Sequence, residues 1–289
     1  MLGTILQLLI GGIANGFLYC LVATEYTLIY NATDLLNFGH DKFILLGAYI
    51  MFFTFMSALG LPTILSMLCS LVVMLLLGIL MSYTIFNPLR MMSSRLYAGI
   101  GTLVLGRIIS EFARLVYGAV PKTVTYLSGI VRIGPVIVTK TNLVIIVVSV
   151  ALIVLLQLFF KKTKTGKAML CINQNKNAAS LMGINVSWMI ALITGISVMI
   201  CAILGMLLAP LVNVTLNMSG IYGTKGFAAG IIGGFGNLPG AIVGGLFIGI
   251  VENMSVLVLP AVYKDIVSYV IMIGFLLWKP NGILSKKQK

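Results

Sequence analysis

Long apolar stretches without a charged residue dominate this chain. Met1 to Thr24 and Phe43 to Leu89 contain no Asp, Glu, Lys or Arg, and the same holds for Thr141 to Phe160, Ser187 to Val212 and Gly226 to Val251. A helix needs about 20 apolar residues to cross the hydrocarbon core of a bilayer, so the second stretch is long enough for two crossings. Because alternating apolar and polar strands are absent, the pattern indicates membrane-spanning helices rather than a β-barrel.

Turn-forming residues divide these stretches into individual spans. The Leu61-Pro62 pair splits the longest stretch, because proline suits the start of a helix and disrupts its interior. The N-terminal stretch lacks a basic segment and a small-residue cleavage site, which favours a retained first span. The predicted spans are Leu2–Tyr30, Phe43–Ala58, Pro62–Phe86, Leu96–Tyr117, Thr141–Phe160, Ser187–Val212, Gly226–Val251 and Val262–Trp278.

The predicted fold class is all-α, a polytopic transmembrane helical bundle of about eight to ten spans or half-spans. Residues 1–289 are predicted to form a single transmembrane domain, because no soluble domain of useful size fits between the spans. Composition agrees, since 60% of residues are hydrophobic and only 9% are charged. A soluble domain carries about 25% charged residues, so this chain could not cover its surface in water.

The net charge of +13 is clustered beside the apolar spans. One short loop holds Lys161, Lys162, Lys164, Lys167 and Lys176, and the C-terminal end holds Lys279, Lys286, Lys287 and Lys289. Lysine and arginine are retained on the cytoplasmic side of membranes, so both clusters are predicted to be cytoplasmic. The clustering indicates topology rather than a nucleic-acid surface, and no nucleic-acid partner is expected.

This topology predicts a broken helix near the C-terminus. If the five-lysine loop lies inside, Gly118–Lys140 lies outside and the loop with Arg90 and Arg95 lies inside. An even number of crossings must then separate Val186 from Lys279, although only three segments are evident. The stretch Gly233-Gly-Phe-Gly-Asn-Leu-Pro-Gly240 disfavours continuous helix, so Gly226–Val251 is predicted to form two short spans or half-spans.

Glycines around this break recur every four residues, as in Gly226, Gly230 and Gly234 and again in Gly236, Gly240 and Gly244. Residues four apart share a helix face, and small residues there let helices approach closely. The pattern predicts tight packing within one subunit, with a subunit–subunit or translocation-pathway surface as the alternative.

Three stretches resemble the permease subunits of branched-chain amino-acid ABC importers, and they follow that family's order. The first stretch comprises Tyr26-Thr-Leu-Ile-Tyr30, Leu36-Asn-Phe-Gly-His40 and Leu46-Gly-Ala-Tyr49. The second runs from Thr165-Gly-Lys-Ala-Met169 to Ala178-Ala-Ser-Leu-Met-Gly-Ile-Asn185. The third comprises Phe227, Gly233-Gly-Phe-Gly-Asn-Leu-Pro-Gly-Ala241, Gly244-Gly245 and Glu252. A closing Lys279-Pro-Asn-Gly-Ile283 is similar to the family's usual ending. The chain departs from the pattern at Glu25 and at Asp41-Lys42, which bears on the substrate more than on the family.

The resemblance implies a multi-pass protein of the bacterial inner (plasma) membrane, surrounded by lipid. It also implies partners: two cytoplasmic ABC ATPase subunits, a second permease subunit in a homodimer or heterodimer, and an extracytoplasmic substrate-binding protein. The sequence contains no GxxxxGK[ST] phosphate-binding loop. This chain is therefore expected to bind no cofactor itself, and ATP and Mg²⁺ are expected to be used by the partner subunits.

Residues 161–186 are the predicted cytoplasmic coupling loop that contacts an ATPase. A polar start is followed by a short helix with one apolar side, and Gly183 is placed to end that helix in a left-handed conformation. A loop that only sets topology would not need apolar residues at helical spacing. The predicted contact residues are Asn173, Gln174, Asn177, Ala178, Ala179, Leu181, Met182 and Gly183.

Polar residues inside spans are costly, about 2.5–3.5 kcal/mol for a charged one, and mark candidate pathway positions. The candidate pathway residues are Glu25, Asn37, His40, Arg107, Phe235, Gly236, Asn237, Pro239 and Glu252. The apolar residues Phe235, Gly236 and Pro239 are included because they lie in the predicted helix break. Arg107, Glu111 and Arg114 share a helix face, either as a paired structural stripe or with one surplus arginine for a substrate carboxylate.

The other candidates have two interpretations each. Glu25 is expected to meet a substrate ammonium or to pair with a distant lysine, and Glu252 to line the pathway or to end a helix at the interface. A single histidine, His40, is more often a hydrogen-bonded structural residue than a ligand. Cys20, Cys69, Cys171 and Cys201 lack CxxC spacing and are expected to be buried as small apolar residues, so neither a disulfide nor a metal site is predicted.

The predicted function is a permease subunit that translocates branched-chain or related amino acids, with urea, amides or another small solute as alternative cargo. Because no nucleophile–base pair or paired carboxylates stand out, the chain is not expected to be an enzyme and no catalytic residue is assigned. From a different class, a stand-alone ion-coupled secondary transporter would use the two broken segments as its binding site. Such a transporter would need no ATPase partner.

Overall fold

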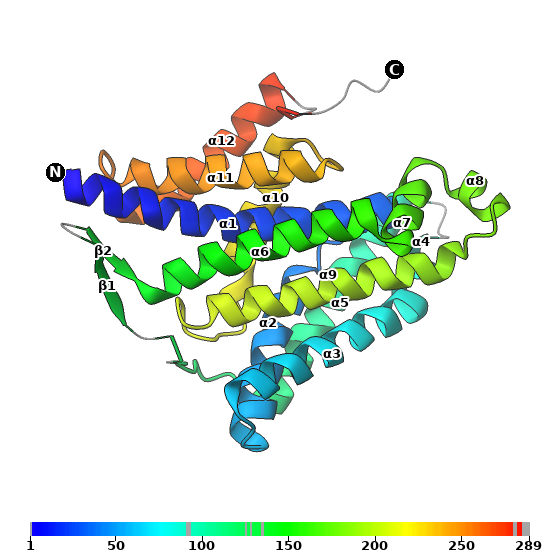
Figure 1. Cartoon of the computed structure of the whole chain (residues 1–289), viewed down its shortest axis with the longest axis horizontal. Coiled ribbons are helices and arrows are strands. Elements are labelled where there is room, and N and C mark those ends of the chain that lie inside the picture. The colour runs from blue at the N-terminus through cyan, green and yellow to red at the C-terminus, as the bar shows by residue number, and fades with distance from the viewer. Residues whose placement is uncertain are drawn as a thin grey trace. The chain divides into compact units, whose positions relative to one another are not determined.

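The computed structural model describes residues 2–90, 94–124, 126–127, 129–133, 136–279 and 282–284. Its helices are α1 (Leu2–Thr33), α2 (Asp41–Tyr49), α3 (Thr63–Met81), α4 (Asn87–Arg90), α5 (Arg95–Tyr117), α6 (Lys140–Lys162), α7 (Lys164–Gln174), α8 (Lys176–Leu181), α9 (Val186–Leu208), α10 (Met218–Gly233), α11 (Leu238–Ser255) and α12 (Lys264–Trp278). π-Helical segments at Ile50–Ala58 and Ser82–Phe86 continue α2 and α3, and a short 3₁₀ turn, Ala261–Tyr263, precedes α12. Figure 1 shows these helices and one small hairpin, β1 (Ile130–Ile133) with β2 (Val136–Thr139).

The all-α membrane bundle is confirmed. Within the described residues, eight helical segments are long and apolar enough to cross a membrane. α10 has 16 residues and is shorter than these, as expected for a half-span. Pro280, Asn281 and the C-terminal lysines Lys286, Lys287 and Lys289 lie outside the described residues, so the predicted tail and part of the closing motif are not described.

The chain packs into two compact units. Unit 1 contains Met1–Thr27, Thr125–Ala151 and Gly220–Lys289, and unit 2 contains Leu28–Val124 and Leu152–Ser219. α1 and α6 each contribute residues to both units.

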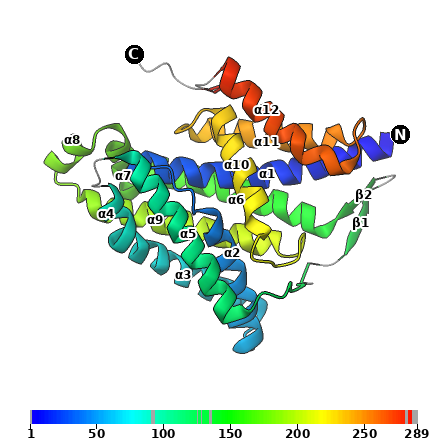
Figure 2. The ribbon, with the colours of Figure 1, turned by 180° about the vertical axis from the view of Figure 1, so that it is seen from behind.

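In unit 2, α9 is the central helix. It packs against α2 and α3, and Figure 1 shows α3 running alongside it. In the most apolar stretch of α9, 78% of the residues are buried. The corresponding share for the segment that begins with α3 is only 22%, so α3 presents most of its surface outward. Small residues allow the close approach: a Cβ on Gly47 of α2 would overlap Ala202 of α9. Figure 2 shows α2 and α5 of the same unit from behind.

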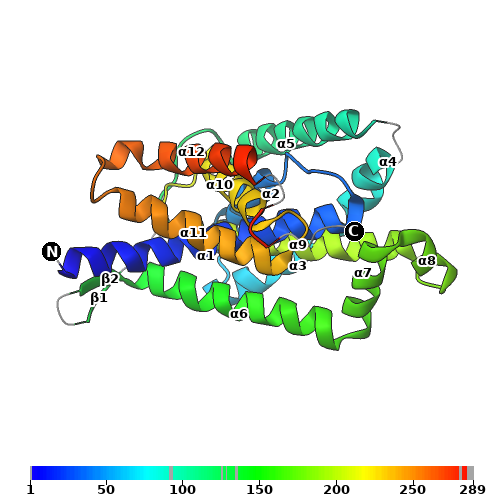
Figure 3. The same ribbon diagram turned by 90° about the horizontal axis from the view of Figure 1, so that it is seen from above.

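In unit 1, small residues bring α1 and α11 into backbone contact. A Cβ on Gly249 would overlap the backbone of Gly16, and the Cys20 thiol donates to the Ile242 carbonyl at 3.0 Å. Figure 3 shows α12 lying along α11, with which it packs. Glycines of the predicted repeat pack as closely, because a Cβ on Gly244 would overlap the Ala229 carbonyl and a Cβ on Gly240 the Gly233 carbonyl. The prediction that the repeat serves tight packing within one subunit is therefore confirmed.

A buried ion network also ties the helices of unit 1 together. Lys225 of α10 lies 2.7 Å from Glu252 Oε1 of α11 and 2.6 Å from Asp265 Oδ1 of α12. The other oxygen of Glu252 accepts from the hydroxyls of Tyr19 on α1 (3.1 Å) and Ser268 on α12 (2.9 Å). Lys225 and Glu252 are 2% and 1% exposed, so each of these two charges is compensated inside the protein.

This network explains why α10 begins earlier than predicted. The hydropathy pattern placed the span at Gly226 because Lys225 precedes it, but the helix starts at Met218 and includes the lysine. The carboxylates of Glu252 and Asp265 neutralise that charge, so the helix can enter the apolar region with it. By contrast, α9 ends at Leu208 rather than at Val212, because Pro210 has no N–H to continue the helical hydrogen bonds.

The predicted break between Gly226 and Val251 is confirmed. α10 ends at Gly233 and α11 begins at Leu238, and Gly234 and Gly236 between them have φ angles of 102° and 88°. α10 is not among the helices long enough to cross a membrane, so the even number of crossings between Val186 and Lys279 stays a prediction. The β1–β2 hairpin was not predicted, although the uninterrupted β-branched residues of Val136–Thr139 were an available signal.

Replacing Lys225 with methionine is expected to destabilise unit 1 strongly. The substitution leaves the Glu252 carboxylate buried without its cation, which costs about 3–5 kcal/mol when one partner of a buried pair is removed. The measurement is the unfolding temperature of the purified protein in detergent. The double variant Lys225→Met/Glu252→Gln should recover much of the loss, and Lys264→Met, a half-exposed neighbour of Asp265, should change little. An unchanged unfolding temperature in Lys225→Met would contradict the role of the network.

Candidate functional site

The basic loop after α6 folds into two short helices with well-formed caps. Thr163 caps α7 by accepting from the Gly166 N–H at 2.9 Å. Asn175 caps α8 by accepting from the N–H groups of Asn177 and Ala178, both at 3.0 Å. Gly183 has φ 82°, so the predicted left-handed termination is confirmed. Figure 3 shows α7 turning away from the end of α6 and α8 standing beyond it.

The two faces of α8 differ sharply. Leu181 and Met182 are 90% and 75% exposed, whereas Ala179 is 2% exposed and packs within unit 2. The expectation that Ala179 shares the exposed apolar side with Leu181 is wrong. Residues two apart on a helix lie about 200° from one another, so these two side chains point in opposite directions. Asn173 and Gln174 belong to the last turn of α7 and are exposed.

The segment between α1 and α2 is the first break in helical structure along the chain, and it holds the histidine. Asn37 and His40 are 2% and 0% exposed. His40 Nδ1 lies 3.4 Å from Asn37 Nδ2, and its Nε2 lies 3.3 Å from both Ser197 Oγ and Cys201 Sγ of α9. His40 is therefore hydrogen-bonded inside the protein, as the preferred interpretation expects, and its part in a pathway stays a prediction.

The break between α10 and α11 is satisfied by the chain itself. The N–H groups of Ile283 and Leu284 donate to the carbonyls of Ile232 and Gly233, and the Asn237 amide donates to the Leu284 carbonyl at 2.7 Å. Pro239 lies in the first turn of α11. Phe235 packs edge-on against Phe227 with ring centroids 5.5 Å apart. Phe235, Gly236, Asn237 and Pro239 thus form one tight turn, and their part in a pathway stays a prediction.

α5 carries charged residues on an otherwise apolar exposed surface. Arg107, Glu111 and Arg114 are all exposed, and Arg114 pairs with Glu111 at 2.8 Å. The paired stripe of the sequence analysis is therefore confirmed for Glu111 and Arg114. Arg107 lies near the middle of the helix, among exposed apolar side chains such as Val104 and Ile108.

The two acidic candidates are both buried. Glu25 lies in α1 and is 0% exposed, and its proposed contact with substrate stays a prediction. Neither interpretation of Glu252 included an internal cation, but Lys225 supplies one from 27 residues away. A part of Glu252 in the pathway stays a prediction. The sequence analysis missed Lys225, although a lone lysine inside a glycine-rich apolar stretch was a usable signal.

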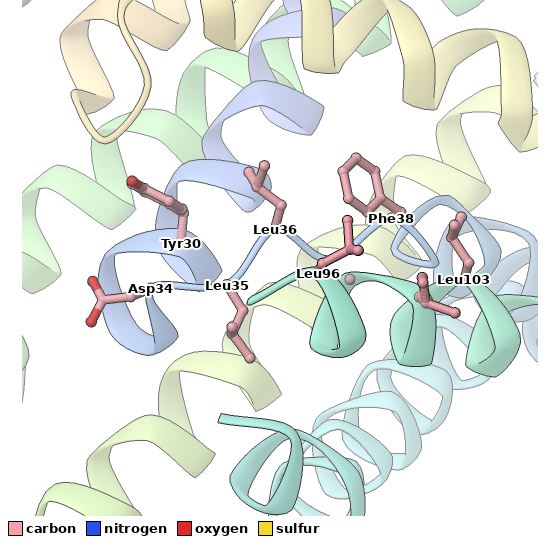
Figure 4. Close-up of a pocket in the computed structure, with 9 residues that line it drawn as sticks. Tyr30, Asp34, Leu35, Leu36, Phe38, Leu96 and Leu103 are labelled. Atoms are coloured by element: carbon pink, nitrogen blue, oxygen red, sulfur yellow. The ribbon is translucent and has the colours of Figure 1, made fainter. Parts of the chain in front are cut away.

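Within unit 2, a cavity of about 450 Å³ lies beside the first break. Apolar side chains of the segment after α1 and of α5 line it, and Figure 4 shows Leu36 and Phe38 on one side with Leu96 and Leu103 on the other. The Asp34 carboxylate and the Tyr30 side chain are the polar groups at its edge. The sequence analysis did not anticipate this cavity.

Several known proteins are similar to this chain in sequence. The chain is 29% identical to the high-affinity branched-chain amino acid transport system permease protein LivH of Escherichia coli, and 28% identical to BraD of Pseudomonas aeruginosa, over 98% of this chain and 96% of each relative. A probable LivH of Methanocaldococcus jannaschii is 27% identical over 96% of this chain and 91% of its own length. Among solved structures, PsaBC from Streptococcus pneumoniae in complex with a Fab has a TM-score of 0.43 at 15% identity, over 97% and 92% of the two chains.

The family described as the branched-chain amino acid transport system permease component matches residues 8–276. This range includes both helix breaks, α7 and α8, and the buried ion network. The eight helices long enough to span a membrane agree with a multi-pass protein of the bacterial plasma membrane. The chain therefore belongs to the branched-chain amino acid transport system permease family.

Proposed function

We propose that this chain is the permease subunit of an ABC importer that carries a branched-chain or related amino acid into the cell. The observation that carries the proposal is the family match over residues 8–276. The relatives LivH and BraD are named for high-affinity branched-chain amino acid transport and align over nearly the whole chain. Because the sequence has no phosphate-binding loop, ATP hydrolysis is assigned to two cytoplasmic ATPase subunits.

The face of α8 that carries Leu181 and Met182 is the proposed ATPase contact. These two side chains project into the medium from a helix whose opposite side is anchored by Ala179. Large apolar side chains exposed outside the membrane favour a protein partner that covers them. A capped, anchored helix moves as a rigid body, so it can pass a displacement of the ATPase to the spans.

The charged face of α5 supports a second permease subunit. Arg107 is exposed near the middle of a membrane-spanning helix, where contact with lipid costs about 2.5–3.5 kcal/mol. A protein neighbour or an aqueous pathway removes that cost. We assign the face with Arg107 to the contact with a second permease and to the pathway between the two, where the arginine attracts the substrate carboxylate. An extracytoplasmic binding protein delivers the substrate to this pathway.

The proposal is tested on the complex purified in mild detergent with its co-purifying proteins and reconstituted in vesicles. We expect two permease and two ATPase subunits by native mass spectrometry. Leucine, isoleucine or valine, supplied with the binding protein, should stimulate ATP hydrolysis and be taken up. Stimulation of ATP hydrolysis by urea or an amide alone would identify that compound, rather than an amino acid, as the cargo. Uptake that needs an ion gradient and no ATP would show that the protein is a secondary transporter rather than part of an ABC importer.

Leu181→Asp is expected to release the ATPase subunits. The substitution removes a packed side chain worth about 1.5–3 kcal/mol, so binding should weaken more than about tenfold. The measurement is ATPase co-purification at equal permease level. Leu181→Met should retain the contact, and Lys162→Gln should bind normally because it only removes one charge from the same loop. Ala179→Asp should instead lower the permease level, because it buries a carboxylate inside unit 2. Normal ATPase binding by Leu181→Asp would exclude this face of α8.

The contact between α8 and the end of α1 also supports an inference about the side of the membrane on which the N-terminus lies. Lys176 of α8 pairs with Asp34, directly after α1. α1 has 32 residues, or about 48 Å of helix at 1.5 Å per residue, more than the roughly 30 Å hydrocarbon core. If α8 is cytoplasmic, the N-terminus is therefore outside.

The native Cys171 allows a direct test of this topology. It is exposed in α7, contrary to the expectation that all four cysteines are buried, whereas Cys20 and Cys201 are buried as expected. A membrane-impermeant maleimide should label Cys171 only after cells are permeabilised. In a Cys171→Ser background, Thr4→Cys should react in intact cells, because Thr4 is exposed at the start of α1. The reverse labelling pattern would invert the topology.

A further inference from the structure

An ion pair joins α8 to a distant part of unit 2. Lys176 Nζ, on the first residue of α8, lies 2.5 Å from Asp34 Oδ2. The lysine side chain is 25% exposed and the aspartate 58%. A pair this exposed adds little to overall stability. Its importance follows from the elements that it connects.

Asp34 stands at a sharply defined end of α1. Its φ angle is 60°, which makes it the one non-glycine residue with positive φ in the described part of the chain. Its N–H donates to the Tyr30 carbonyl at 2.8 Å, and the Leu35 N–H donates to Thr33 Oγ1 at 3.2 Å. Aspartate tolerates the left-handed region better than most residues, so the chain leaves α1 in a fixed direction.

The chain that follows is attached to α5 at several points. Leu35 packs in a cluster with Ala98 of α5. The Phe38 N–H donates to Thr102 Oγ1 of α5 at 3.1 Å. Gly39 lies so close to Gly106 that a Cβ on either residue would clash with the backbone of the other.

The same segment is attached to α9 at its other end, through the contacts of His40 with Ser197 and Cys201. Residues 34–40 therefore connect α8 at one end with α5 and α9 at the other. We name residues 34–40 the connecting segment. The cavity of about 450 Å³ lies beside it, lined by apolar side chains of the segment and of α5 (Figure 4).

We infer that Asp34 and Lys176 are positioning residues for transport, which make a displacement of α8 move the connecting segment and, through it, α5 and α9. The inference rests on the proposed function, because it takes α8 as the ATPase contact. Movement passes between distant sites through contiguous packed and hydrogen-bonded elements, and each step of this route is a contact within unit 2. The ion pair is the link from α8 to the connecting segment.

The experiment uses the complete complex in vesicles and compares Asp34→Asn, Lys176→Gln and the double variant with the parent. Asparagine keeps the shape of the side chain and also tolerates positive φ, so Asp34→Asn removes the charge without disturbing the backbone. The readout is the coupling ratio, the number of substrate molecules taken up per ATP hydrolysed. Each single variant should lower this ratio about two- to fivefold, the range that a partly exposed ion pair can supply.

Two features separate a positioning role from a general loss of structure. The double variant should lose no more than either single variant, because the two residues act as one unit. Lys176→Arg should retain the parental ratio, and so should Lys164→Gln, which removes an exposed lysine from α7. ATPase co-purification and unfolding temperature should equal those of the parent in every variant.

The outcomes are distinct. A parental coupling ratio in Asp34→Asn overturns the inference, as does additive loss in the double variant. Loss of ATPase binding in Lys176→Gln also overturns it, because Lys176 would then be a docking residue. A parent complex whose ATP hydrolysis does not respond to any amino acid supplied with the binding protein refutes the proposed function itself, independently of the variants.

Discussion

The structure of this permease depends on the requirement that backbone polar groups be hydrogen-bonded inside the bilayer. Continuous helices meet it without help, but the chain interrupts helix at residues 34–40 and again at residues 234–237. At the second break, the N–H groups of Ile283 and Leu284 donate to carbonyls at the end of α10. At the first break, the side chains of Thr102 and Asn37 accept from the backbone. Both breaks persist because neighbouring elements replace the missing helical bonds.

Charged side chains within the spans also need partners, and the two groups of charges in this chain are placed differently. Lys225 and Glu252 compensate each other inside unit 1, with Asp265, Tyr19 and Ser268 completing their hydrogen bonds. That network joins four helices of unit 1. The charges of α5 instead point out of the protein, although their helix is long enough to cross the membrane. Because of this contrast, we assign the Lys225–Glu252 network to stability and the charged residues of α5 to a contact with another subunit.

Within unit 2, the elements nearest the proposed ATPase contact are anchored rather than loose. Caps at Thr163, Asn175 and Asn185 fix the starts of α7, α8 and α9. The buried side of α8 packs through Ala179, and Lys176 joins it to the end of α1. An element that is fixed at several points can displace its neighbours when it moves, whereas a flexible loop would absorb the displacement.

The sequence by itself determined the class of protein, the position of most spans, the helix break near Pro239 and the left-handed Gly183. These features depend on local properties, namely apolar length, the missing N–H of proline and the conformational freedom of glycine. Tertiary structure alone decided that Lys225 lies inside a helix, because the carboxylates that neutralise it come from two other helices. It also decided that Ala179 is buried while Leu181 is exposed, and that Lys176 meets Asp34. Such pairings join residues far apart in the chain, and a periodic pattern identifies a helix face without naming the surface that it will contact.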